Sequence, residues 1–502
     1  MGKGEIKLEY TGFVIFIAQL LSVITSLVFQ LMIIRAVSAL YPNPEEVRTV
    51  YGVWSNVSRD VIPYFAFVAG VLPFWALRFT ARGKEDAVKT GILTNLAISL
   101  VAASLYVLLL PLIVSTLNVE KYFLLYLITA IQIVEIYTNN AFEQCIHAIK
   151  PHAVGYGLLL REIFKLPLGY ILINTVYSKD PLVGAMLGVI IACVFQAIYY
   201  VRLLSNYLKQ KFRWEYLKEW LKGSVVNIYN AVGNQIAAFI FIMLFVYAGE
   251  SARGIHGAAT VIAAIINYSS FLAFALYPKL LAEGKSEDVT TAMRIVLMFA
   301  LPMTAGAIAL SDSYLTVLSS GFSVAVPVLV VLAIDSLVAT ISGIYGATLV
   351  GFERFDEEAR ISFRELLRSR LFIAFSLTYL HSAITLPTTF YVLTYIQNDP
   401  VQAALYISII NSAARFAMFL IQLIIVRGVV RIRIPWLNVA KYVFVSVLMA
   451  TVLFLIPHPT TLMLTFVVTA IGGILYLAVV MVIDKEARIL ISKMLQMIKI
   501  KG

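Results

Sequence analysis

The stretch RFTARGKED, residues 78–86, ends one long apolar run and leads into the next, and KLLAEGKSED, residues 279–288, does the same 201 residues further on. A second pair of similar segments, LREIFKL at 160–166 and FRELLRS at 363–369, is separated by 203 residues. Two motifs repeated in the same order at nearly the same offset predict that the chain contains two copies of one unit. The alternative is chance similarity, because the positive-inside rule makes short basic loops alike.

Composition places both copies in a membrane. The chain has 502 residues, of which 61% are hydrophobic and 13% are charged, and its mean hydropathy is +0.88. Soluble domains carry about 25% charged residues. The net charge of +11 is attributed to basic cytoplasmic loops beside anionic lipid, and no nucleic acid is expected as a partner. The sequence therefore predicts a multi-pass protein of the cell membrane, surrounded by the lipid bilayer.

The number of helices follows from the length of the apolar runs. A membrane-spanning helix needs about 20 apolar residues. Lys and Arg are frequent in every second connection, which places both termini in the cytoplasm. The predicted fold class is an all-α polytopic membrane protein with two six-helix lobes and two further helices. The fourteen predicted runs are 12–34, 53–77, 91–114, 122–142, 157–177, 181–202, 224–248, 256–280, 290–310, 324–349, 370–395, 402–426, 437–456 and 460–483.

Four parts of the chain follow from the repeat. They are an N-terminal lobe at 1–203, a cytoplasmic linker at 204–222, a C-terminal lobe at 223–434, and a last part at 435–502 with two helices and a basic tail. Parallel repeats of this kind are a known transporter architecture, with the substrate site between the halves. The linker sequence SNYLKQKFRWEYLKEWLKG (205–223) has aromatic residues and Leu at helical spacing, with Lys between them. It is either an amphipathic helix on the inner membrane surface or a solvated linker helix.

Polar residues within the apolar runs are the candidates for a binding site, because such residues are costly in a membrane and usually face a cavity or a partner. Gln132, Glu135, Asn139 and Glu143 are spaced to lie on one side of the fourth helix. The alternative for any such stripe is hydrogen bonding between helices. The residues predicted to form a cavity for a phosphate-sugar head group are Arg35, Asn139, Arg161, Lys165, Asn227, Asn230, Asn234, Arg368, Asn411 and Arg415.

The charges in this set predict its chemistry. Arg161, Lys165, Arg368 and Arg415 would make the inner part of the cavity cationic, which suits a phosphate or pyrophosphate because Arg binds such groups bidentately. Arg415 lies in mid-membrane, as does Asp335, so each of the two either pairs with an opposite charge or lines water. Glu135 and Asp335 are the candidates for coupling to H⁺ or Na⁺.

The sequence predicts no other cofactor, no metal site and no enzymatic activity. The five histidines show no metal-ligand spacing with Cys or carboxylates. The triplet GKS at 284–286 is no phosphate loop, because Lys279 stands where that motif requires its first glycine. A membrane glycosyltransferase or polymerase would need external catalytic loops, and the predicted outer connections are short. A scaffold without transport activity would explain neither Arg415 nor Asp335.

Several short motifs agree with one family. The first run ends IIRAVS (33–38), the second begins YGVWS (51–55), and WEYLKEWLKGSVVNIYNAVGNQ (214–235) leads into the seventh. In these motifs the chain resembles the lipid-linked oligosaccharide and polysaccharide flippases of the multidrug/oligosaccharidyl-lipid/polysaccharide exporter superfamily. It departs from them by the insertion LYPNPEEV (40–47) and by lacking a proline at 223–226, where the seventh helix of the family begins. These departures bear on the subfamily rather than on the fold.

The resemblance implies a two-lobed flippase. It would move a polyprenyl- or dolichyl-linked (pyro)phosphate oligosaccharide from the cytoplasmic to the outer leaflet by alternating access, for surface glycan or glycoprotein assembly. It would act as a monomer, with glycosyltransferases as candidate partners. The alternative within the superfamily is a cation-coupled exporter of small organic compounds, whose cavity would be acidic.

Overall fold

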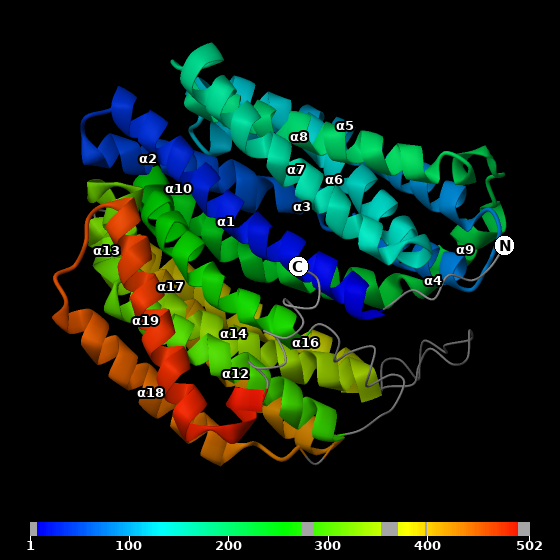
Figure 1. Ribbon diagram of the computed structural model, residues 1–502. Coiled ribbons are helices and arrows are strands. Elements are labelled where there is room, and N and C mark those ends of the chain that lie inside the picture. The colour runs from blue at the N-terminus through cyan, green and yellow to red at the C-terminus, as the bar shows by residue number, and fades with distance from the viewer. Residues whose placement is uncertain (1–7, 274–285, 353–369, 397–398, 431, 490–502) are drawn as a thin grey trace. The chain divides into compact units, whose positions relative to one another are not determined.

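The protein is built from helices. The computed structural model describes residues 8–273, 286–352, 370–396, 399–430 and 432–489, and every regular element within these ranges is helical (Figure 1). This confirms the all-α class. Helices occupy each of the fourteen predicted runs in whole or in part. Within the described ranges, nine helices are long and apolar enough to cross a membrane, or ten if one bent pair counts as a single span. Fourteen crossings with both ends inside stay a prediction.

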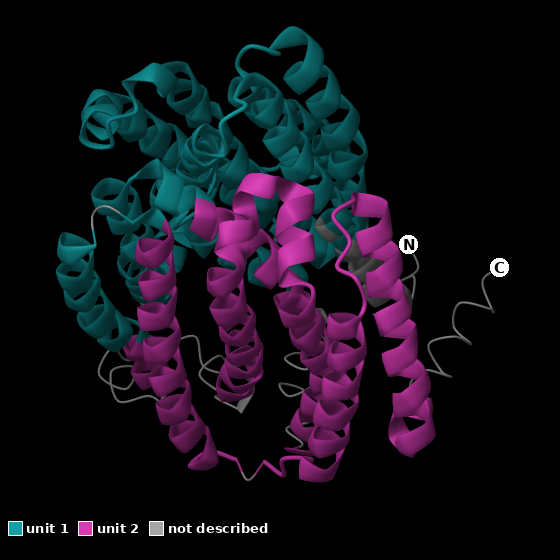
Figure 2. Cartoon of the chain, turned by 90° about the vertical axis from the view of Figure 1, so that its left-hand side faces the viewer, with its two compact units in different colours: residues 1–254, 378–400 teal, residues 255–377, 401–502 magenta. Residues whose placement is uncertain are grey.

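The helices form two compact units, which Figure 2 shows in two colours. Unit 1 comprises residues 1–254 and 378–400. Its long helices α5, α6, α7 and α8 pack side by side, and α1 lies along α7 (Figure 1). The elements of unit 1 are α1 (Leu8–Leu40), α2 (Pro44–Ser55), η1 (Asn56–Val61), α3 (Ile62–Ala66), α4 (Val71–Ala81), α5 (Ala87–Thr116), η2 (Glu120–Tyr122), α6 (Phe123–Ile149), α7 (Pro151–Ile171), η3 (Leu172–Val176), α8 (Pro181–Leu204), η4 (Tyr207–Lys209), α9 (Trp214–Gly223), the first part of α10 (Val225–Asn267) and the second part of α16 (Arg370–Tyr395).

Unit 2 comprises residues 255–377 and 401–502. The last two helices, α18 and α19, are part of its core: Tyr442 and Tyr476 are buried, and the hydroxyl of Tyr476 donates to the carbonyl of Met298 on α12 at 2.7 Å. Its elements are the second part of α10, η5 (Tyr268–Ala273), α12 (Ser286–Ala309), α13 (Ser311–Leu318), η6 (Ser320–Ala325), α14 (Val326–Phe352), the first part of α16, α17 (Pro400–Arg427), α18 (Trp436–Leu455) and α19 (Leu462–Ile483).

The two units have other boundaries than the predicted lobes. Unit 1 keeps the first part of α10 and the second part of α16, because these segments bond to its other helices and to each other. The hydroxyl of Tyr64 donates to the carbonyl of Gln235, and that of Tyr379 to the carbonyl of Tyr229, both at 2.7 Å. The predicted division of the chain into the four parts 1–203, 204–222, 223–434 and 435–502 stays a prediction.

The second predicted run is a broken helix. Helix α2 begins at Pro44, earlier than expected, with the Asn43 side chain accepting the Glu45 N–H at 2.9 Å. The chain then passes through the π-helical η1 and the short α3, and α4 continues at an angle of 61° to the preceding part. The break comprises residues 67–70, between Ala66 and Val71, and ends at Gly70.

Helix α10 contains the junction between the seventh and eighth predicted runs. Gly249 interrupts it with φ 83° and ψ 172°, a conformation open mainly to glycine. The residues after this kink pack tightly on α2. A Cβ added to Gly52 would collide with the Glu250 carbonyl, and one added to Gly254 would collide with the Arg48 carbonyl. The predicted outer connection is therefore a kinked helix held against α2, not a loop.

The predicted linker helix is shorter than expected. Only α9, at 214–223, is a full helix, and 205–213 contains a single 3-10 turn. Asp86 and Thr90 accept the backbone N–H groups of Lys211 and Arg213 at 2.9 and 3.0 Å, which holds this part extended. Trp220 anchors α9 in a buried cluster with Phe79.

Most of the second copy of the repeat motifs lies outside the described residues. This applies to 279–285 of KLLAEGKSED and to all of FRELLRS at 363–369, so the internal repeat stays a prediction. In the first copy, RFTARGKED forms the end of α4 and the turn into α5, and LREIFKL lies within α7.

Candidate functional site

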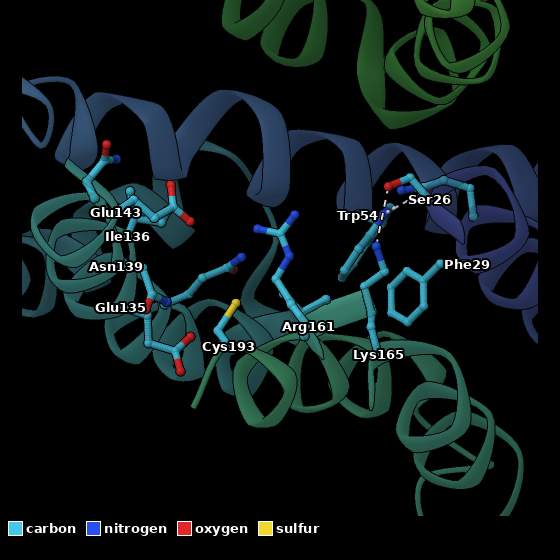
Figure 3. A pocket seen from close by; sticks show the side chains of 14 residues that line it. Ser26, Phe29, Trp54, Glu135, Ile136, Asn139, Glu143, Arg161, Lys165 and Cys193 are labelled. Atoms are coloured by element: carbon cyan, nitrogen blue, oxygen red, sulfur yellow. Dashed lines mark hydrogen bonds between the residues drawn. The ribbon is translucent and has the colours of Figure 1, made fainter. Parts of the chain in front are cut away.

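Unit 1 contains a polar cavity of about 370 Å³ between α1, α2, α6, α7 and α8 (Figure 3). All four residues of the predicted α6 stripe line it, which confirms that they share one side of that helix. Arg161 and Lys165 of α7 line the cavity as well. Its lining also includes Ser26, Phe29, Gln30, Trp54, Ile136, Asn140, Val189 and Cys193. The structure thus brings together Asn139, Glu135, Arg161 and Lys165 from the predicted site.

The α6 side of the cavity carries amides and carboxylates. Both carboxylate oxygens of Glu135 are shielded from solvent and have no hydrogen-bond partner among the described residues. The side-chain oxygens of Gln132 and Asn139 are in the same situation. Glu143, one turn further along, accepts a hydrogen bond of 2.8 Å from Gln196 Nε2. Because buried polar atoms normally have partners, the three unpartnered groups indicate space for a bound molecule, ion or proton.

The α7 side of the cavity is an ion-paired cluster. Glu162, which is almost fully buried, forms ion pairs with both Arg161 and Lys165, and the distance from Arg161 Nη2 to Glu162 Oε1 is 3.0 Å. Its second oxygen also accepts from the Thr25 hydroxyl of α1. Lys165 Nζ lies 3.3 Å from Ser26 Oγ and is nearly buried. Glu162 thus neutralises Lys165 and holds Arg161 at the edge of the cavity.

Arg161 is the cation that reaches farthest into the open space. Its side chain is 31% exposed, compared with 9% for Lys165. Figure 3 shows it between Glu135 and Glu143 on one side and Trp54 and Phe29 on the other. The lining of this cavity contains two carboxylates for its two cations, and Glu162 adds a third carboxylate beside them. The predicted cationic group also included Arg368, outside the described residues, and Arg415, which lies in unit 2, so its cationic character stays a prediction. The cavity presents one accessible guanidinium rather than a basic surface.

Among the residues that sequence reasoning missed, three shape this site. Glu162 was visible in the LREIFKL motif, where Glu162 and Lys165 have the i, i+3 spacing of an ion pair within one helix. Gln30 and Trp54 gave no comparable signal, because neither is charged. Gln30 Oε1 accepts from Trp54 Nε1 and from the Tyr51 hydroxyl, both at 3.1 Å, so the indole is held at the cavity wall.

Asp335 and Arg415 form an ion pair within unit 2. Arg415 Nε of α17 lies 3.1 Å from Asp335 Oδ1 of α14. The Asp335 side chain is 8% exposed and that of Arg415 is 39% exposed. Of the two arrangements that the sequence left open for these charges, the structure shows the pair. Asn411 lies one helical turn before Arg415 and is buried.

The remaining predicted site residues do not line the cavity of unit 1. Arg35 is exposed near the end of α1. Asn227 and Asn230 are partly buried on α10, and Asn234 is exposed. Arg368 lies outside the described residues. No group of three His, Cys, Asp or Glu side chains that could hold a metal ion occurs in the part of the chain that the structure describes.

Solved transporter structures share this fold. One is the inward-facing conformation of a multidrug resistance MATE family transporter of the MOP superfamily, with a TM-score of 0.61, 16% identity, and coverage of 81% of this chain and 95% of that chain. Another is the lipid II flippase MurJ in an inward closed conformation, with a TM-score of 0.61, 14% identity, and coverage of 94% and 98%. An outward-facing MATE transporter aligns with a TM-score of 0.55, 15% identity, and coverage of 84% and 96%.

The fold is therefore that of MOP superfamily transporters, the multidrug/oligosaccharidyl-lipid/polysaccharide exporters that the sequence motifs resemble. The expected likeness is confirmed at this level. No protein-family model and no curated protein matches the sequence.

Proposed function

We propose that this protein is a membrane transporter that moves a lipid-linked (pyro)phosphate oligosaccharide from the cytoplasmic to the outer leaflet by alternating access. Its fold, shared with solved transporters, supports the transporter class. The alignment with the lipid II flippase covers 94% of this chain, and those with the MATE transporters named above cover 81% and 84%. The flippase fold thus accounts for more of the chain.

The observation that carries the proposal is the composition of the cavity in unit 1. Arg161 offers a partly exposed guanidinium, the group that binds phosphate oxygens most specifically. Around it lie the amides of Gln132, Asn139 and Asn140, which can both donate to and accept from sugar hydroxyls, and the indole of Trp54, which offers an apolar face to a sugar ring. A cavity of about 370 Å³ accommodates part of a head group, such as a phosphate with the first sugar.

A second candidate function is a cation-coupled exporter of small organic compounds. Glu135 and Glu143 favour it, because they place two carboxylates in the same cavity. The two candidates assign different partners to the same groups. In the flippase the head-group phosphate binds Arg161, and Glu135 takes up H⁺ or Na⁺. In the exporter an organic cation binds directly to the carboxylates.

The test is head-group translocation in liposomes. Purified protein is reconstituted with a fluorescent polyprenyl pyrophosphate oligosaccharide, and access of a membrane-impermeant quencher to the head group is followed with and without a proton or sodium gradient. We expect wild-type protein to translocate the head group. Arg161→Gln should slow it about tenfold or more, since a charge-assisted hydrogen bond contributes about 1.5–3 kcal/mol.

Two further variants make the result specific. Arg161→Lys keeps the charge but loses the bidentate geometry, and an intermediate rate is expected. Arg202→Gln removes an exposed guanidinium at the end of α8, away from the cavity lining, and should leave the rate unchanged. Absence of head-group translocation together with gradient-driven efflux of organic cations would reject the flippase and favour the exporter.

A further inference from the structure

One side of α9 fixes it to the rest of unit 1. Trp220 is fully buried and meets the ring of Phe79 edge-on, with the ring centres 5.5 Å apart. Just after the helix, Ser224 Oγ accepts a hydrogen bond of 3.0 Å from Trp75 Nε1. Leu217 packs against the same cluster. Figure 1 shows α9 beside α4, in agreement with these contacts.

A second apolar strip on α9 faces away from this core. Trp214 is 67% exposed, Leu221 is 49% exposed, and Val225, where α10 begins, is 48% exposed. Trp214 and Leu221, seven residues apart, lie on one side of α9, and Val225 follows at the start of α10, after the turn at Ser224. At about 100° per residue, this strip lies about 100° around the axis from the side that holds Trp220.

The third side of α9 is polar. Glu215, Glu219 and Lys222 are all exposed. A helix that packs on protein and otherwise meets water needs one apolar side and one polar side. Helix α9 has two separate apolar sides and one polar side. These three sides suit contact with the protein core, with water and with a second apolar environment outside unit 1.

The charges around the exposed strip indicate which apolar environment the strip contacts. Lys218 lies at the edge of the strip, and Lys222 lies on the polar side, where that side adjoins the strip. Residues 209–222 contain five basic and two acidic residues, which gives a net charge of +3. The basic residues are Lys209, Lys211, Arg213, Lys218 and Lys222, and the acids are Glu215 and Glu219.

We propose that α9 is an interfacial helix that binds an anionic lipid surface. Trp214, Leu221 and Val225 lie in the interfacial region of the inner leaflet, where Trp is favoured. Lys218 and Lys222 extend to lipid phosphates, since Lys can bury its aliphatic part and keep its ammonium group at a polar surface. The other apolar side keeps Trp220 in unit 1, so α9 ties the end of α4 to the membrane surface. This inference does not depend on what the cavity binds.

The test measures the depth of two positions on α9 in the full-length protein. Cys145 and Cys193 are replaced by Ala, and one new cysteine is introduced as Leu221→Cys or, as the matched control on the polar side, Glu219→Cys. Each variant is labelled with bimane and reconstituted into vesicles. One set of vesicles contains phosphatidylglycerol, the other only phosphatidylcholine, and both carry brominated acyl chains as quenchers.

In the phosphatidylglycerol vesicles, we expect the label at 221 to be quenched by brominated lipid at least about threefold more than the label at 219. We expect this difference to shrink in phosphatidylcholine vesicles, and also in the anionic vesicles once Lys218→Gln and Lys222→Gln are added. Equal quenching at 221 and 219 would overturn the proposal, and so would a pattern that is the same in both lipids. Size-exclusion profiles matching the wild type show that each variant is folded.

Discussion

Arg253 and Asp60 form a bidentate ion pair with both side chains buried. Arg253 Nε donates to Asp60 Oδ2 at 2.7 Å, and Nη2 donates to Asp60 Oδ1 at 2.8 Å. Asp60 lies in the π-helical η1, and Arg253 lies four residues after the kink at Gly249. The pair therefore joins the bent second run to the segment where the chain leaves unit 1.

Removing one member of this pair should strongly destabilise unit 1. A buried charge left without its partner costs about 3–5 kcal/mol, whereas loss of both charges costs less. We expect Asp60→Asn and Arg253→Gln each to lower the melting temperature in detergent, and the double variant Asp60→Asn/Arg253→Gln to recover part of the loss. If the double variant loses as much as the two single variants added together, the two residues are not coupled.

Glu162 should position the cations of the cavity. Glu162→Gln leaves Lys165 nearly buried without a carboxylate, and it frees Arg161 from its ion pair. We expect lower thermal stability and slower transport. The double variant Glu162→Gln/Lys165→Gln should regain stability without regaining the transport rate, because Arg161 still lacks its partner. Transport that recovers together with stability would show that Glu162 has only a structural role.

The pair of Asp335 and Arg415 should matter for coupling. Arg415→Ala removes the cation that pairs with Asp335, so we expect loss of transport. Arg415 is 39% exposed, and a carboxylate left without its partner can take up a proton, so we expect folding to be retained. Asp335→Asn removes the group that could exchange a proton or sodium ion, so transport should lose its dependence on the ion gradient. Both variants are assayed in liposomes with and without each gradient. Normal transport by Arg415→Ala, or unchanged gradient dependence in Asp335→Asn, would exclude these roles.

The part of the site that was predictable depends on patterns within one helix. The residues Gln132, Glu135, Asn139 and Glu143 share a side of α6 because of their spacing alone, and their place at a cavity could be inferred from the cost of burying them. The helices were located from the length of their apolar runs, which are continuous in sequence.

Hydrogen bonds between distant helices could not be predicted. Glu162 meets Thr25 across 137 residues of sequence, and no local pattern in either segment specifies the other. In unit 1, Arg161 and Lys165 lie beside the carboxylate of Glu162, whereas the predicted cationic group also contained Arg368 and Arg415, so the charge of the whole site stays a prediction. The bend between Ala66 and Val71 was missed because the run remains apolar through the break.

Acid should loosen the attachment of the linker to α5. Asp86 accepts from Arg213 Nε at 2.7 Å, and this hydrogen bond, with that from the Lys211 N–H, holds the pKa of the Asp86 carboxyl below its ordinary value of 3.8. A lowered pKa in the folded state means that the pair stabilises the protein at pH values above that ordinary value. The contribution is lost as the pH falls through the lowered pKa.

Asp86→Asn is a well-matched variant for this test. Asp86 has a φ of 67°, a conformation that Asn also tolerates, so the substitution removes the charge without straining the backbone. We expect the variant to melt at a lower temperature than wild type at pH 7. The gap should begin to narrow below pH 3.8 and close as the pH falls through the lowered pKa, where the folded wild-type carboxyl is protonated as well. A gap that stays constant down to pH 3 would mean that the Asp86 charge contributes nothing to holding the linker.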